Sequence, residues 1–452
     1  MCTSNSKHDD SAAVMKVAVC PRERHLVDGA GMIRTVAVML YCHFCVALLC
    51  LNVMFDLFFL GAPVFLLHKI RLLPTKLYLS VTTFIISWTT PIVFTMPMIF
   101  SGTKMYCNDI DLLIEAKSKN SLLLANHGSR IDWMVGMFTG FSRSMADRSC
   151  ERIRVGFVCE ALIQFMPLIG WYRKLVAHDI FLWRSFKQDA PTIKKNIHEY
   201  HSANERRMLF LSPEGIVVDF GSKDMKYIAA CRKFCLDQNY EPFEYVLTPR
   251  YKGSMCLLDQ VQHGKGPVVS ICVAYVQDGK LLNCSLLSPD RVVPDIYSLN
   301  QGINGKPIDI YIHLKKMNLA QDMNDPKTFM MENYKEKNEI LAEWDQRLLA
   351  GRAGSKSWMS QFSVVKNNSI ECYACQIGHT VTMLLVAIIF DRLQTLLNVF
   401  GTLFCLVSGC HTIGWLLNST SMESVPFETG IKSIALALQN RKSRAQNSAK
   451  TE

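Results

Sequence analysis

Apolar residues are concentrated in two long segments in the first quarter of the chain. From Thr35 to Leu67 the sequence is almost continuously apolar, interrupted by Asp56 and Pro63. A second apolar segment runs from Leu77 to Phe100. Since one membrane-spanning helix needs roughly 20 apolar residues, we expect the first segment to form one long span or a bent hairpin. The second is expected to span the membrane or to lie in its interface.

The last quarter of the chain repeats this pattern. Two apolar stretches, Thr380–Phe390 and Leu396–Leu417, flank the charged pair Asp391-Arg392, which predicts a second hairpin in or on the membrane. The predicted organisation is a polar tail at 1–30, N-terminal membrane segments at 31–104, an α/β domain at 105–355, a linker at 356–376, a C-terminal membrane hairpin at 377–418 and a basic tail at 419–452.

Between these ends, short apolar runs alternate with charged stretches. Short continuous runs are typical of buried strands, and longer mixed stretches with a helical period are typical of helices. The expected strands are Leu122–Ala125, Met208–Leu211, Tyr245–Leu247, Val268–Tyr275 and Ile308–His313, and the expected helices are Ile193–Asn204, Asp224–Gln238 and Asn333–Leu349. This alternation predicts an α/β fold with a central mixed sheet flanked by helices, joined to membrane-embedded helical segments at both ends.

Composition favours a membrane-anchored globular domain. The 452 residues are 49% hydrophobic and 19% charged, which is more apolar than an ordinary soluble enzyme. The formal net charge of +10 suits a protein that lies against anionic lipid or binds phosphate-bearing substrates. The sequence has no zinc-finger spacing or RNA-binding motif, so nucleic acid is not an expected partner. The 17 cysteines are scattered, with one C-x-x-C at Cys372 and Cys375, and we expect mostly reduced thiols and no metal site.

The main chemical signal is the stretch Asn126-His127-Gly128-Ser129-Arg130-Ile131-Asp132, which follows the first expected strand. Side chains five residues apart lie about 140° apart on a regular helix. His127 and Asp132 can therefore meet only if His127 lies on the turn before the helix or at its first residue. A carboxylate on one ring nitrogen fixes the tautomer and leaves the other nitrogen as a general base. By itself such a pair is more often found on a surface or at a helix cap.

Three further stretches place charged residues at the ends of apolar runs. They are Ile180–Arg184, Leu211–Gly215 with Glu214, and Val246–Arg250. Sites in α/β folds collect at strand ends. Each stretch alone is more typical of a surface residue or a turn, but their order and spacing together indicate a site.

These four blocks resemble the motifs of the glycerolipid acyltransferase family, which includes the 1-acylglycerol-3-phosphate acyltransferases. The stretch from Asn126 to Asp132 resembles the family's N-H-x4-D block, Phe181 and Arg184 match the second block, Pro213-Glu214-Gly215 the third, and Leu247-Thr248-Pro249-Arg250 the fourth. Met166–Trp171 and the C-terminal hairpin are most similar to the epsilon-type and lysocardiolipin acyltransferase branch.

The resemblance implies an acyl-CoA-dependent transferase that esterifies the free hydroxyl of a lysophospholipid without a covalent acyl-enzyme. It implies His127 and Asp132 as catalytic residues, with His127 as the base. The substrate-binding residues that it implies are Asn126, Arg130, Phe181, Arg184, Glu214, Gly215, Pro249 and Arg250. Glu214 would hold the glycerol part of the acceptor, and Arg184 and Arg250 would bind phosphate. Acyl-CoA is expected as a co-substrate, the lysophospholipid and the bilayer as partners, and no cofactor is expected.

Two positions depart from the family pattern. Ile216-Val217 stands where the third block usually continues as Thr-Arg, and Cys159 stands where this branch usually has a lysine. The favoured acceptor is 1-acylglycerol-3-phosphate, giving phosphatidic acid, with lysocardiolipin or lysophosphatidylinositol as alternatives. A divergent, inactive lipid-binding membrane protein is the alternative of another class. The expected location is the endoplasmic reticulum membrane, with the mitochondrial outer membrane as the alternative.

Overall fold

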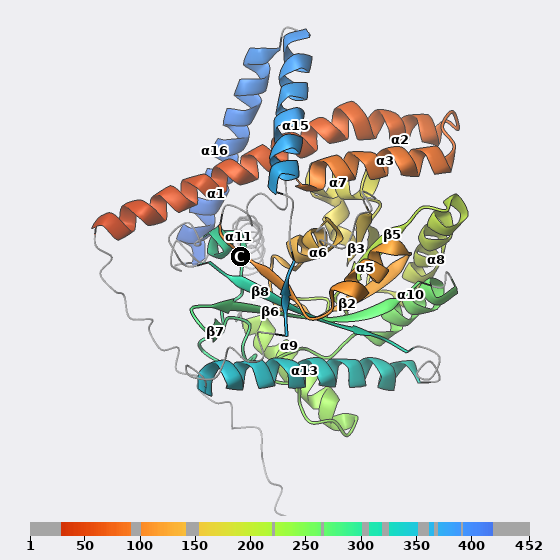
Figure 1. Cartoon of the computed structure of the whole chain (residues 1–452), viewed down its shortest axis with the longest axis vertical. Helices are drawn as coiled ribbons and strands as arrows, with labels where there is room; N and C mark the ends of the chain where they lie inside the picture. Colours follow the sequence, from red (N-terminus) through yellow and green to blue (C-terminus); the bar gives the residue numbers. More distant parts are fainter. Residues whose placement is uncertain are drawn as a thin grey trace, which may run out of the picture.

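The computed structural model describes residues 29–91, 101–141, 153–218, 222–263, 266–300, 307–318, 325–350, 361–365, 369–389 and 392–418. At its centre a mixed sheet lies between two layers of helices (Figure 1). The strands are β1 Met105–Cys107, β2 Ser121–Ala125, β3 Arg154–Glu160, β4 Ile180–Leu182, β5 Arg207–Leu211, β6 Val268–Gln277, β7 Lys280–Leu281, β8 Asp309–Lys316 and β9 Ser363–Val364. The expected α/β fold with a central mixed sheet is confirmed.

The sheet has a parallel half and a mixed half, in which β8 and β1 are parallel to each other. In the described part of the chain the strand order is β4-β3-β5-β2-β6-β8-β1-β9, with β7 paired to β6. The five strands from β4 to β6 are parallel, whereas β8 runs antiparallel to β6. The carboxyl ends of the parallel strands therefore meet at one edge, where loops can bring side chains from several strands together.

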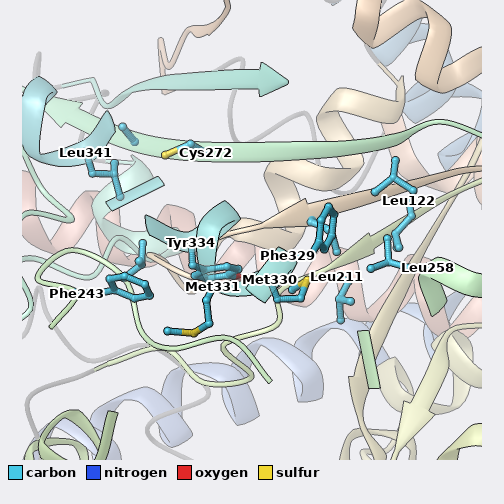
Figure 2. Close-up of a cluster of buried hydrophobic side chains, with 14 of the residues drawn as sticks. Leu122, Leu211, Phe243, Leu258, Cys272, Phe329, Met330, Met331, Tyr334 and Leu341 are labelled. Atoms are coloured by element: carbon cyan, nitrogen blue, oxygen red, sulfur yellow. The ribbon is translucent and has the colours of Figure 1, made fainter. Parts of the chain in front are cut away.

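Helices cover both faces of the sheet. One layer contains α5 Ile110–Ser118 and α6 Asp132–Phe141. The 3₁₀ helix η4 Ala161–Phe165 and α7 Ile169–Leu175 lie beside it, and α7 packs on the apolar helices from the start of the chain. The other layer contains α8 Phe186–Ala203, α9 Ser222–Asp237, α10 Tyr251–His263 and α13 Pro326–Ala350. The short helix α11, Ile296–Asn300, belongs to neither layer and contacts α1. Alternate residues of β2 serve the two cores: Leu122 and Leu124 face one cluster, and Leu123 and Ala125 the other. Figure 2 shows the first cluster, with Leu122 and Tyr334 of α13 labelled. A strand buried on both faces explains the continuous apolar run.

One of the five expected strands is wrong. The chain bends at residues 244–246, and residues 245–247 do not form a strand. The backbone N–H groups of Glu244 and Tyr245 both donate to Asn338 Oδ1 at 2.8 Å, and the N–H of Leu247 donates to Glu214 Oε2 at 3.2 Å. Side chains from distant segments thus satisfy the hydrogen bonds that a neighbouring strand would otherwise provide.

The apolar segments form helices outside the sheet layers. A helix runs from α1 Gly29–Phe55 through the π-helical turn η2 Asp56–Gly61 into α2 Ala62–Lys69, and α3 Thr75–Thr90 returns beside α2. Near the other end, α15 Ser369–Ile389 projects beyond α1, away from the sheet, whereas α16 Leu393–Asn418 crosses α1 and ends near residues 296–300 (Figure 1). Among the described residues one helix, Val36–Lys69, is long and apolar enough to cross a membrane by length and composition.

A buried polar contact joins these apolar helices. Asp56 is 0% exposed and accepts hydrogen bonds from Thr89 Oγ1 of α3 at 2.5 Å and from His379 Nε2 of α15 at 2.9 Å. It therefore connects η2, α3 and α15. The predicted basic tail at 419–452 and the polar tail up to residue 28 lie outside the described residues, as do 92–100 and, within the linker, 356–360 and 366–368. Strand β9, which joins the sheet, lies within the stretch expected to be that linker.

Candidate active site

His127 and Asp132 are in contact at the carboxyl end of β2. His127 lies on the loop that follows β2, and Asp132 is the first residue of α6. His127 Nδ1 lies 2.8 Å from Asp132 Oδ2. A carboxylate can only accept a hydrogen bond, so Nδ1 carries the proton and Nε2 presents its lone pair. Among the described residues no hydrogen-bond partner of Nε2 is found, and the side chain is 28% exposed.

Two further donors hold the Asp132 carboxylate. The backbone N–H of Ser129 donates to Oδ2 at 3.2 Å, and the Tyr275 hydroxyl of β6 donates to Oδ1. Asp132 is 2% exposed and Tyr275 is 0% exposed. The carboxylate is therefore fixed between the loop, the imidazole and β6, which leaves the ring little freedom to rotate.

The electrostatic surroundings make His127 a stronger base. Burial alone lowers the pKa of its imidazole, but the hydrogen bond and charge of Asp132, with the charge of Glu214, outweigh burial. The net result is a pKa above the ordinary 6.5. A base that titrates above 6.5 is close to the pH at which general-base catalysis is most efficient in cells.

Gly128 allows the loop to pass close to a fixed side chain. A Cβ at Gly128 would lie 2.7 Å from the Asn283 amide nitrogen. That amide cannot move away easily, because Asn283 donates to Val273 O at 3.0 Å and accepts from the N–H of Tyr275 at 3.0 Å. The glycine of the motif is thus required by a close approach to β6 and its neighbouring turn.

The Glu214 carboxylate holds the loop that carries His127 in place. Its two oxygens accept the backbone N–H of His127 at 2.9 Å and that of Leu247 at 3.2 Å. Glu214 is 2% exposed, and burial raises the pKa of its carboxyl group against the lowering effect of these hydrogen bonds. The expected role of Glu214 was to hold the glycerol part of a substrate. That role stays a prediction; in the structure the carboxylate links the carboxyl ends of β2 and β5 to the loop before Arg250.

The two arginines expected to bind phosphate converge on Gly215. Arg184 Nη2 donates to Gly215 O at 3.1 Å and lies 3.2 Å from Glu160 Oε2. Arg250 lies on the other side: a Cβ at Gly215 would be 3.6 Å from its guanidinium carbon, and Arg250 Nη2 donates to Tyr227 OH at 3.3 Å. Gly215 has a φ of +74°, which a side chain would strain. We call Arg184 and Arg250 the cation pair. Because Gly215 directly follows Glu214, the cation pair lies one residue from the carboxylate that accepts the backbone N–H of His127.

The remaining residues of the predicted site have less direct positions. Asn126 is 1% exposed, and its amide exchanges two hydrogen bonds with the backbone of Val273, so it joins the loop to β6. Phe181 is 9% exposed within β4, and Pro249 is buried. The charge of Arg130 acts on the buried Asp295 carboxyl group, where it lowers the pKa against the raising effect of burial.

Arg173 lies beside one of the two positions that depart from the family pattern. Its Nη2 lies 3.1 Å from the sulfur of Cys159, the position where this branch usually has a lysine. The same guanidinium is paired with Asp179 at 2.5 Å. A cation is therefore present at Cys159, but it is partly neutralised. Val217 is half-buried in the loop that follows Gly215.

Two residues of α13 that the sequence did not predict for the site contact the end of β2, just before the loop that carries His127. Lys337 Nζ donates to Leu124 O at 2.7 Å, and Tyr334 OH donates to Ala125 O at 3.0 Å. Lys337 is 1% exposed, and burial lowers its pKa to about 8 from 10.5. They hold the last two carbonyls of β2 and place a positive charge near Glu214.

Curated proteins that are similar in sequence to this chain are glycerolipid acyltransferases. "Probable 1-acyl-sn-glycerol-3-phosphate acyltransferase 5" of Arabidopsis thaliana is 23% identical over 250 residues, 55% of this chain and 56% of the relative. The epsilon 1-acyl-sn-glycerol-3-phosphate acyltransferase of Mus musculus is 25% identical over 158 residues, 35% of this chain and 40% of the relative. Lysocardiolipin acyltransferase 1 of Mus musculus is 28% identical over 160 residues, 35% of this chain and 39% of the relative.

The curated homologues of this chain are glycerolipid acyltransferases. The resemblance that the four motifs indicated is thereby confirmed. This acyltransferase homologue spans less than two thirds of the length of each of these three relatives. No family model matches it. The crystal structure of the 1-acyl-sn-glycerophosphate acyltransferase PlsC from Thermotoga maritima matches with a TM-score of 0.35 and 13% identity, over 71% of this chain and 98% of that chain.

Proposed function

We propose that the protein transfers an acyl group from acyl-CoA to the free hydroxyl of a lysophospholipid. The favoured acceptor is 1-acylglycerol-3-phosphate, which would give phosphatidic acid. The observation that carries the proposal is the contact between His127 Nδ1 and Asp132 at 2.8 Å, with the other ring nitrogen left for a substrate. The names of the curated relatives support the same class of reaction.

The reaction follows from what each group can do. His127 Nε2 removes the proton of the acceptor hydroxyl while its oxygen attacks the thioester carbonyl. The Asp132 carboxylate stabilises the imidazolium that results, and it needs no rearrangement because Ser129 and Tyr275 already hold it. When the tetrahedral intermediate collapses, the C–S bond breaks and the imidazolium returns its proton to the leaving thiolate. The ester forms and His127 is neutral again.

The cation pair gives the site its preference for a phosphate. Arg184 and Arg250 approach Gly215 from two sides, and guanidinium groups bind phosphate oxygens through paired donors. Arg184 is 39% exposed, so it is accessible to a ligand. A phosphate bound between them would direct the attached glycerol toward the loop that carries His127, because Glu214 links Gly215 to that loop.

The helices at the two ends of the chain support a membrane location. Val36–Lys69 has the length and apolarity of a span, and exposed side chains such as Phe59 at 57% and Leu66 at 59% face outward from it. We propose that this helix anchors the protein, with the endoplasmic reticulum as the favoured membrane. A lipid substrate would then be presented close to the site.

A panel of acceptors tests the proposal. The full-length protein, purified in detergent and returned to vesicles, would receive radiolabelled acyl-CoA with lysophosphatidic acid, lysocardiolipin, lysophosphatidylinositol or lysophosphatidylcholine in turn. We expect labelled phosphatidic acid as the main product. A preference for lysocardiolipin or lysophosphatidylinositol would change the acceptor and retain the reaction. Binding of lysophospholipid without any labelled product in a folded sample would contradict the proposal and favour an inactive lipid-binding protein.

A further inference from the structure

Five large, exposed apolar side chains lie on neighbouring elements next to Arg184. They are Leu162, Phe165, Trp171, Trp183 and Phe186, which are 62%, 60%, 41%, 52% and 53% exposed. We call these five residues the aromatic patch. They come from η4, α7, the end of β4 and the start of α8, and the rings of Phe165 and Trp183 lie 6.2 Å apart. Large apolar side chains that gather on a surface mark an interaction site.

Two residues at the patch, Leu168 and Arg184, have a positive φ, which is rare for residues other than glycine. Leu168, between Phe165 and Trp171, has a φ of +62°, and Arg184, directly after Trp183, has a φ of +64°. Residues with a Cβ rarely adopt this region, and a bulky residue such as leucine does so least readily. Strained backbone persists where the surrounding structure maintains it, and it is concentrated at functional sites. Both turns lie within the patch or at its margin.

The patch adjoins the proposed membrane anchor. Tyr172 of α7 and Val176, the residue that follows α7, are buried in one apolar cluster with Val53 of α1 and Leu57 of η2. Trp171, next to Tyr172 in the sequence, is exposed on the same short helix. The helix that carries part of the patch is thus seated directly on the apolar helix Val36–Lys69.

Exposed cations border the patch, and one of them, Arg184, is paired with the Glu160 carboxylate at 3.2 Å. Lys174 and Lys187 are exposed at its edges, and Arg184 follows Trp183. Aromatic rings with lysine and arginine around them are the composition that proteins place at the boundary between lipid headgroups and acyl chains. A second copy of the chain is a poorer partner, because a symmetric contact would bring like charges together.

We propose that the aromatic patch inserts into the membrane interface, so that a lysophospholipid passes from the bilayer to Arg184 without leaving the lipid. This inference rests on the proposed function, because it describes how the acceptor reaches that site. The anchor holds the protein on the membrane, and the patch sets the site's height and orientation there. The acyl chain of the acceptor stays beside Phe165 and Trp183 while the phosphate meets Arg184.

Photo-crosslinking tests the position of the patch without requiring turnover. Phe165 would be replaced by the photoreactive residue p-benzoylphenylalanine in full-length protein reconstituted in phosphatidylcholine and phosphatidylglycerol vesicles. A matched control carries the same residue at Leu349, which is 72% exposed at the end of α13 on the other side of the sheet. We expect lipid adducts, detected by mass spectrometry, at position 165 and not at position 349. Crosslinks to a second copy of the chain, or equal adducts at both positions, would overturn the inference.

A kinetic arm tests delivery of the acceptor. In the double variant Phe165→Ser with Trp183→Ser, the KM for a long-chain lysophospholipid in vesicles should rise by at least about tenfold, since two large apolar contacts are lost. The KM for a short-chain, water-soluble acceptor should rise much less, so the ratio of the two values changes. Leu236→Ser, at a residue 60% exposed on α9, serves as the control. An unchanged ratio would contradict delivery from the bilayer. If no acceptor is acylated at all, the proposed function fails and the crosslinking result still decides the patch.

Discussion

The Tyr275 hydroxyl offers a directional test of the His127–Asp132 pair. Tyr275 donates to Asp132 Oδ1, and His127 Nδ1 binds the other oxygen of the same carboxylate. In Tyr275→Phe the carboxylate loses a donor and becomes a stronger partner for the imidazolium. A hydrogen bond to a charged group contributes about 1.5–3 kcal/mol. If half of this is passed to the imidazole, the acid limb of the kcat/KM profile moves to higher pH by about half to one pH unit.

The assay is acyl transfer from labelled acyl-CoA to the best acceptor, measured between about pH 5 and pH 9. Asp132→Asn should move the limb the other way, because the charge that raises the His127 pKa is removed. Tyr240→Phe is a matched control, since Tyr240 also donates to a carboxylate, Glu332 Oε1 at 2.9 Å, on the surface. An acid limb that stays in place or moves to lower pH in Tyr275→Phe would refute the reasoning.

Three further substitutions test the supports of the site and of the anchor. Glu214→Gln leaves one of two backbone N–H groups facing an amide NH₂, so kcat should fall more than the acceptor KM changes. Lys337→Met should abolish a rise in the free energy of unfolding between about pH 8 and pH 10.5. The pKa of Lys337 is lower in the folded protein than in the unfolded chain, so the unfolded chain binds more protons in this window and stability rises with pH. The rise should be about 3 kcal/mol, measured by thermal or denaturant unfolding. Asp56→Asn should lower the melting temperature in detergent, because Thr89 and His379 both donate to the carboxylate and an amide can satisfy only one of them well.

Exposed residues of the same types serve as controls for these variants. Glu339→Gln and Lys335→Met lie on the outer side of α13, and Asp290→Asn lies on an exposed turn. They should leave kcat and the melting temperature near their original values. A larger effect on acceptor KM than on kcat in Glu214→Gln would show that the carboxylate contacts the substrate directly. An unchanged pH dependence in Lys337→Met, or an unchanged melting temperature in Asp56→Asn, would contradict the structural role given to that residue.

Patterns that depend on local burial were predictable from the sequence. The apolar run of β2 is buried on both faces of the sheet, so its hydropathy identifies it without knowledge of its neighbours. The contact between His127 and Asp132 also follows from local geometry, because it needs only a turn before a helix. Residues 245–247 show the limit of this approach. Their apolar pattern is that of a strand, but Asn338 and Glu214 take the backbone hydrogen bonds from far along the chain.

The supports of the site depended on long-range contacts. Tyr275 lies in an apolar strand and has the pattern of a core residue, although its hydroxyl reaches Asp132. Lys337 lies in a charged stretch that is typical of a solvated helix. A signal was nevertheless present, because Tyr334, Lys337 and Leu341 fall at helical spacing on one face, and both neighbours are apolar. A lysine on the apolar face of a helix needs a buried acceptor, here the carbonyl of Leu124.

The central claim is that His127 is the general base of acyl transfer, and His127→Ala tests it most directly. The rate of labelled phospholipid formation would be measured with saturating acyl-CoA and acceptor, in vesicles that contain equal amounts of inserted protein. His198→Ala, at an exposed histidine of α8, is the control. Loss of a positioned base should reduce kcat roughly 10²–10⁴-fold while His198→Ala stays near wild type. A His127→Ala protein that is folded, inserted and transfers acyl groups at close to the original rate would contradict the account.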